Sequence, residues 1–196
     1  MEENGATLEE IQAELENMGI ESGKLFSAAM TNSKYDTFKE YYDNVRENKG
    51  NPEKEQFNIV TKGGVPLRVI HDVINHDYNN HVLSADEWET LLKNIDKVEL
   101  GATSQKKPRF SGKPIVLKVK AKDKFYGVAL ELFENKNPII TTAFIDKEGS
   151  IDNWIKNEIS PSGTKHLTFL GTNLKDIIYD IFPNFKENVV KGAKLY

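Results

Sequence analysis

Apolar residues recur along this chain with two different periods, which separate helix-forming from strand-forming segments. After Thr7, a capping residue with Glu10 three positions later, apolar residues follow helical spacing until Gly19. A second helix is predicted over residues 35–47, where an apolar stripe is formed by Phe38, Tyr41, Tyr42 and Val45. Residues 48–52 then predict a turn or linker.

The second part of the chain mixes both periods. A short strand is predicted over residues 65–70 and a helical piece over 72–78. Ser84 begins a helix that ends near Asn94, with Glu87 completing a capping box. Alternation with a period of two then predicts four strands, over residues 98–102, 114–121, 125–133 and 138–145. The last two connections are short, so at least three of these strands should be antiparallel neighbours.

Two helices complete the pattern, one capped by Ser150 and one that begins after Thr172 and ends before Pro183. Helices that precede an antiparallel meander, with a further helix behind it, indicate the α+β class.

We place a boundary at residue 60, between an acidic helical N-terminal region (1–60) and an α+β body (61–196). The net charges of these two parts are −7 and +3, which suggests an acidic appendage on a mildly basic body.

Composition excludes several kinds of site. The chain has 196 residues, of which 38% are hydrophobic, and it contains no cysteine. Disulfide frameworks, thiolate zinc sites and cysteine nucleophiles are therefore excluded. No apolar run reaches the ~18 residues of a membrane helix, and the first residues do not form a signal peptide. We therefore expect a soluble, cytoplasmic protein without a membrane partner.

The distribution of charge is most informative about function between residues 97 and 124. This stretch holds nine basic and two acidic residues, a net charge of +7 in a chain whose formal net charge is −4. Such a stripe is typical of a polyanion-binding surface, although lysines also protect exposed sheet faces. Its loop offers candidate contacts to nucleic acid, in which cations hold phosphate and an aromatic ring stacks on a base. These candidates are Lys107, Arg109, Phe110 and Lys113.

The histidines are candidates for proton transfer near neutral pH. His71, His76 and His81 are five residues apart, so they cannot share one face of a continuous helix. The spacing also lacks the HExxH pattern, and neither a metal site nor a cofactor is expected. His81 should lie in a loop just before the Ser84 helix, where catalytic groups are often held. A surface or capping role for His81 is the alternative.

Thr141 and Thr142 are adjacent in an otherwise apolar predicted strand. Because side chains alternate along a strand, the two hydroxyls should face opposite sides of the sheet, and one of them should share its side with the core residues. A threonine that faces a cleft can donate a hydrogen bond to phosphate, whereas a threonine in a strand is also ordinary for its β-propensity.

Two segments resemble a known family. The run from His81 through the Ser84 helix is similar to the histidine, capped helix and L-x-N-P exit of phage-borne nuclease domains, with Ile95 where that family has proline. The segment that begins at Ile140 and contains both threonines, followed by the one that begins at Ser150, resembles the ITAF-D … SID-x-W pattern of the same group. These are the barnase/EndoU/colicin/RelE-like (BECR-fold) nucleases found in MuF-type and large polyvalent phage proteins. The resemblance covers residues 67–158.

The resemblance implies N-terminal helices packed on a four-stranded antiparallel meander. It also implies metal-independent cleavage of RNA, such as tRNA or another structured RNA, by acid–base transesterification. His81, and then His71, would be the general acid and base, and Thr142 or Thr141 would bind the scissile phosphate. The alternative is a phage-encoded binding or inhibitor protein that keeps the fold without the activity. An immunity protein or host protein is a further expected partner.

Overall fold

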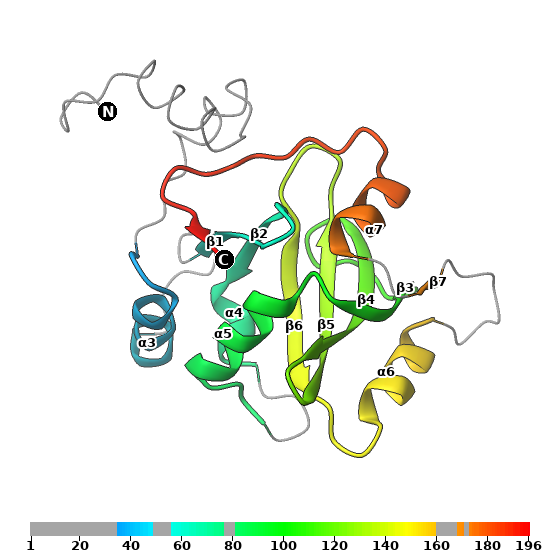
Figure 1. Cartoon of the computed structure of the whole chain (residues 1–196), viewed down its shortest axis with the longest axis horizontal. Coiled ribbons are helices and arrows are strands. Elements are labelled where there is room, and N and C mark those ends of the chain that lie inside the picture. Colours follow the sequence, from blue (N-terminus) through cyan, green and yellow to red (C-terminus); the bar gives the residue numbers. More distant parts are fainter. Residues whose placement is uncertain (1–34, 49–55, 77–80, 160–167, 171–172) are drawn as a thin grey trace.

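The computed structural model describes residues 35–48, 56–76, 81–159, 168–170 and 173–196. The helix expected after Thr7 and the cap expected at Thr172 lie outside these residues. Within them the chain forms one sheet with helices on both faces (Figure 1). The protein is therefore α+β, as the order of helical and strand patterns predicts.

The described strands form one sheet of eight, in the order β7-β3-β4-β5-β6-β2-β1-β8. Their bounds are β1 Gln56–Val60, β2 Pro66–Ile70, β3 Val98–Thr103, β4 Lys113–Ala121, β5 Lys124–Leu132, β6 Ile139–Ile145, β7 Thr168–Leu170 and β8 Lys194–Leu195. The four strands of the predicted meander are β3 to β6, and each pairs antiparallel with the next. The sheet continues past both ends of this meander, through the antiparallel pair β3–β7 and the parallel pair β2–β6.

The described helices are α3 Phe38–Asn48, α4 His71–Ile74, α5 Ala85–Asn94, α6 Ser150–Ile159 and α7 Leu174–Ile181. The capping box at Ser84 is confirmed, since Ser84 accepts the Glu87 amide and Glu87 accepts the Ser84 amide. The cap predicted at Ser150 is wrong. Asp146, not Ser150, accepts the Ile151 amide at the start of α6 (3.1 Å). Asn173 is the N-cap of α7.

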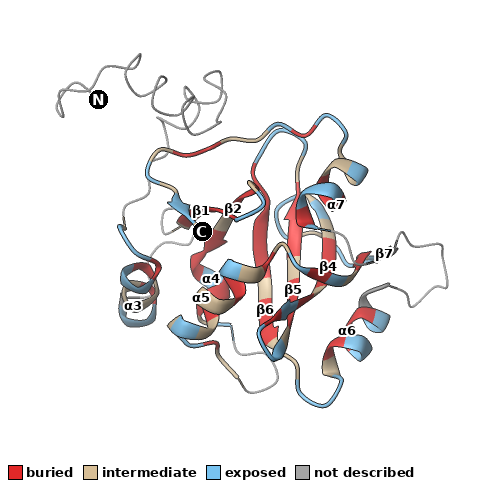
Figure 2. Cartoon of the chain, in the orientation of Figure 1, coloured by how far each residue is buried: buried red, intermediate tan, exposed pale blue. Residues whose placement is uncertain are grey.

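Each face of the sheet has its own core, and Figure 2 shows that the central strands β4, β5 and β6 are largely buried. On the larger face, residues such as Leu117 and Val128 pack against α3, α4, α5 and α7, and we call this the helix-covered face. On the other face, α6 supplies the described helical side chains of a small cluster, in which Trp154 packs edge-on against Phe144 at 4.9 Å between ring centroids. We call this the α6 face.

The expected boundary at residue 60 falls between β1 and β2, which are antiparallel neighbours in the sheet. Phe38 of α3 and Phe57 of β1 are buried in the same core as the body, and their rings are 5.4 Å apart. The described residues before position 60 thus share the core of the residues after it. Among the described residues, no helix has both the length and the apolar character needed to span a membrane.

Candidate functional site

A β-bulge presents both threonines to the same hollow. In the β5–β6 ladder, Ala129 pairs with Thr142 and Leu130 pairs with Ile140, so Thr141 is passed over. The strict alternation expected for this strand is broken at this point, and Thr141 and Thr142 both line one cleft. Bulges commonly redirect side chains beside functional sites.

The basic loop between β3 and β4 lies over the α6 face and is fixed by one buried carboxylate. Glu131, which is 2% exposed, accepts the amide of Arg109 at 2.7 Å, of Phe110 at 2.8 Å and of Gly112 at 3.0 Å. Ser111, between the last two donors, has a left-handed backbone with φ of 64°. Convergent amides around such a residue form an anion-binding nest, and here the anion is the protein's own side chain.

Between this loop and the sheet lies a cleft of about 280 Å³. Of the eight predicted site residues, four line it: Lys107, Arg109, Thr141 and Thr142. Val116 and Trp154 contribute apolar wall, while His76, Ser104 and Lys106 add polar groups. The structure thus brings the loop cations and the threonine hydroxyls together, although β4 and β5 separate the loop from β6 in sequence.

Arg109 is held at the cleft by two contacts besides its amide bond to Glu131. Its guanidinium pairs with Asp72 at 3.0 Å and lies over the Phe110 ring, 5.3 Å from the centroid. The two charged side chains are 48% and 43% exposed, and ion pairs this exposed contribute only about 0–1 kcal/mol. A phosphate can therefore replace Asp72 as the partner of Arg109 at little cost.

Among the described residues, His76 is the histidine that lines the cleft. His81, expected as the acid or base, is not among the described lining residues, and its Nε2 lies 3.1 Å from Glu87 at the start of α5. Burial raises the pKa of Glu87, but hydrogen bonds from Ser84 and His81 outweigh it and hold that pKa below its ordinary value. His81 therefore contacts the capping network of α5, and its role as acid or base stays a prediction.

His71, the second expected acid or base, is also absent from the described cleft lining. Its residue is 7% exposed, and its Nδ1 lies 3.5 Å from Asp72. Its buried Nε2 has no hydrogen-bond partner among the described residues. The described contacts connect His71 to the site through Asp72, which in turn pairs with Arg109.

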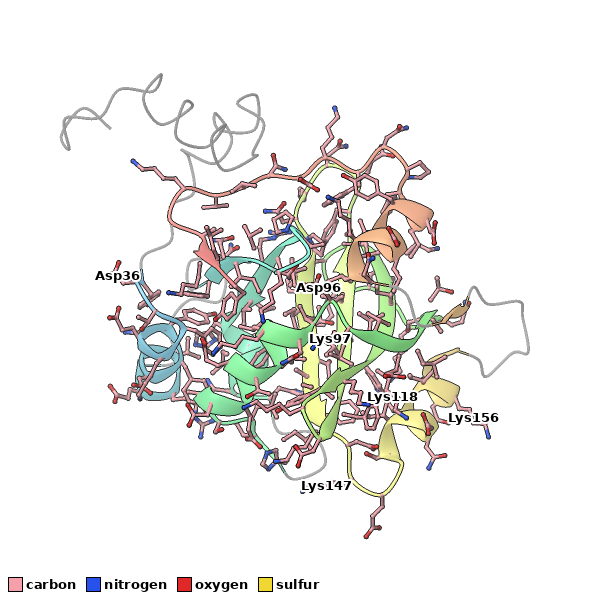
Figure 3. The ribbon with its side chains drawn as sticks, in the orientation of Figure 1. Asp36, Asp96, Lys97, Lys118, Lys147 and Lys156 are labelled. Carbon is pink, nitrogen blue, oxygen red and sulfur yellow. The ribbon has the colours of Figure 1, made fainter. Side chains whose placement is uncertain are left out.

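The remaining predicted substrate contacts, Lys113 and Phe110, are not among the residues that line the cleft. Lys113 lines a neighbouring groove, and Phe110 is 39% exposed on the loop. Of the strand lysines, Lys118 points toward α6, where it pairs with Asp152 at 3.2 Å and lies 4.6 Å from the Phe125 ring centroid (Figure 3). Lys118 is thus a packing residue, whereas Lys120 is exposed.

Sequence reasoning missed two residues that shape the site, Glu131 and Asp72, and it named His76 among the histidines without giving it a place in the site. Alternation along β5 places Glu131 on the same side as Ala129, and an acid at such a position is usually read as solvent-facing. Glu131 is instead buried, and it accepts three amides of a loop that is distant in sequence. The available signal was an acidic residue in a strand next to a loop rich in lysine and arginine. This signal predicts a contact between strand and loop, but it does not specify which acid accepts which backbone amide.

Comparison with known proteins adds no relative: no family model matches this chain, and no curated protein or solved structure matches it either.

Proposed function

We propose that this protein binds RNA in the cleft beneath the basic loop and cleaves it without a metal ion, as a BECR-like endoribonuclease of phage type. The observation that carries the proposal is the convergence of Lys107, Arg109, Thr141 and Thr142 on one cleft. Two cations and two hydroxyl groups match the charge and the acceptor oxygens of a phosphodiester. The α6 face supplies a partly apolar wall against which a base or ribose can rest.

The chemistry that fits this arrangement is transesterification. A base removes the proton from the ribose 2′-hydroxyl, whose oxygen attacks phosphorus, and an acid protonates the departing 5′-oxygen. In this proposal His76, which lines the cleft, makes one of these proton transfers. Arg109 and Lys107 stabilise the charge that develops on the phosphate oxygens, and the threonine hydroxyls orient it.

The test is incubation of the full chain with tRNA and total RNA in EDTA, with end analysis for 2′,3′-cyclic phosphate. His76→Ala should lower the rate by about 10²–10⁴-fold, and Arg109→Ala should lower it as well. Lys147→Ala, at an exposed lysine outside the cleft lining, is the matched control. If His81→Ala abolishes cleavage while His76→Ala does not, the acid–base role moves to His81. Intact RNA at high protein concentration would refute the nuclease proposal.

One observation favours a second candidate, a protein that binds RNA without cleaving it. Transesterification needs both an acid and a base, and among the described residues His76 is the lone imidazole in the cleft lining. The buried carboxylate there, Glu131, already accepts three backbone amides. Salt-sensitive RNA binding with no cleavage products would support this candidate.

A further inference from the structure

A second hollow adjoins the cleft. It is a groove of about 550 Å³, lined by the far side of the basic loop, the end of β5 and the turn after it. Pro108 and Pro114 line both the cleft and the groove. The loop segment between these prolines is therefore a ridge that separates two adjacent hollows.

The ridge is rigidly held. Glu131 accepts the Gly112 amide from below, and Gly112 lies so close to Phe133 that a Cβ there would be 2.6 Å from the ring. On top of the ridge, Phe110 is 39% exposed. An exposed aromatic side chain between two hollows is a feature of surfaces on which bases of a single strand stack.

The groove has the chemistry of a nucleotide subsite. Lys113 and Lys136 line it, with Glu134 as the acid among its lining residues. Phe133 and Phe182 supply half-buried aromatic surface. The Phe133 ring also attracts cations, with Arg68 at 5.7 Å and Lys136 at 6.0 Å from its centroid. Aromatic surface beside cations is how proteins follow single-stranded RNA without reading its sequence.

We infer that the groove is a second subsite, which binds nucleotides adjacent to the phosphate held in the cleft, so that the substrate is single-stranded RNA crossing the Pro108–Pro114 ridge. This inference rests on the proposed function of the cleft. Lys113 and Lys136 contact the neighbouring phosphates, Phe133 lies beside a base, and Phe110 contacts the strand where it crosses the ridge. Lys113, expected from sequence to bind substrate, acquires its role here rather than in the cleft.

The test compares fluorescent oligouridylates of three and eight nucleotides by anisotropy. The wild-type chain should bind the longer strand more tightly, and the double variant Lys113→Ala/Lys136→Ala should lose most of that gain while its trinucleotide affinity stays the same. Loss of two phosphate contacts should reduce the salt slope of log K for the longer strand by about 1.4 and its affinity roughly 10-fold. Lys147→Ala/Lys156→Ala removes the same charge from exposed positions that line neither hollow and serves as control.

Two outcomes would overturn the inference while leaving the cleft proposal intact. One is an unchanged preference for the longer strand in the Lys113/Lys136 variant. The other is an equal loss for both strands, which would mean that these lysines act as general charge. Absence of binding to either RNA would refute the cleft proposal together with the groove, so the two failures are distinguishable.

Discussion

The two faces of the sheet bury their side chains in different ways. The helix-covered face is filled by apolar residues from α3, α4, α5 and α7. Among the described residues, the α6 face has one helix, and a polar loop fixed to the Glu131 carboxylate covers the neighbouring part of the sheet. Apolar packing is insensitive to which polar groups lie nearby, whereas a loop held by one carboxylate leaves room for solvent and ligand beneath it. The difference suggests that one face provides stability and the other provides the site.

Adjacent residues of β4 face opposite sides of the sheet, so they test this division of roles most directly. Leu117→Ala removes a fully buried side chain from the helix-covered face, and we expect the free energy of unfolding to fall by about 2–5 kcal/mol. Val116→Ala on the α6 face should cost less, because fewer atoms are removed and Val116 borders the cleft. Urea denaturation with linear extrapolation measures both. An equal loss would contradict the division of roles.

Glu131→Ala tests whether a single carboxylate holds the loop. Three backbone amides lose their acceptor, so we expect the free energy of unfolding to fall by about 1–3 kcal/mol. Hydrogen exchange at the Arg109, Phe110 and Gly112 amides should accelerate, while exchange within β4 stays slow. RNA affinity should fall as well, and Glu131→Gln, which keeps one acceptor oxygen, should lie between. Unchanged exchange in the alanine variant would show that something else holds the loop.

Gly112→Ala asks whether the ridge needs its close contact with Phe133. The added Cβ would lie 2.6 Å from the ring, and overpacking of this kind costs about 1–3 kcal/mol. Phe133→Leu combined with Gly112→Ala should recover part of the loss, which gives a measurable coupling energy. If the two losses simply add, the contact does not constrain the loop.

The smallest expected effect on stability concerns the capping network of α5, a helix of the helix-covered face. The folded-state pKa of Glu87 lies below its ordinary value of 4.5, so its ionised form favours the folded state above that pH. This contribution should be lost as the pH falls from 4.5 through the lowered pKa. Glu87→Gln should therefore be less stable than wild type at neutral pH, with a difference that narrows in acid. Its RNA affinity at pH 7 should be unchanged, and a clear loss would connect this network to the cleft.

Local patterns predicted the elements that local interactions determine. The Ser84 capping box and the antiparallel pairing of β4, β5 and β6 follow from caps, alternation and short turns. β7 and β8 were missed because their partners are remote in sequence, as in the pairing of Ile59 with Lys194. β1 forms a local hairpin with β2, which sequence reasoning did not recognise. For the site, residue type identified the cations and threonines. The bulge at Thr141 and the burial of Glu131 arise from tertiary contacts that no local pattern carries.

The hydrogen bonds to Glu131 have a consequence for how this site can diversify. All three are made by backbone amides, so none depends on the side chains of Arg109 or Phe110. These side chains can be exchanged while the loop keeps its path, much as antigen-binding loops vary on a constant framework. We therefore expect the loop to accept new specificities by substitution at positions 109 and 110, provided that Glu131 and Gly112 are kept.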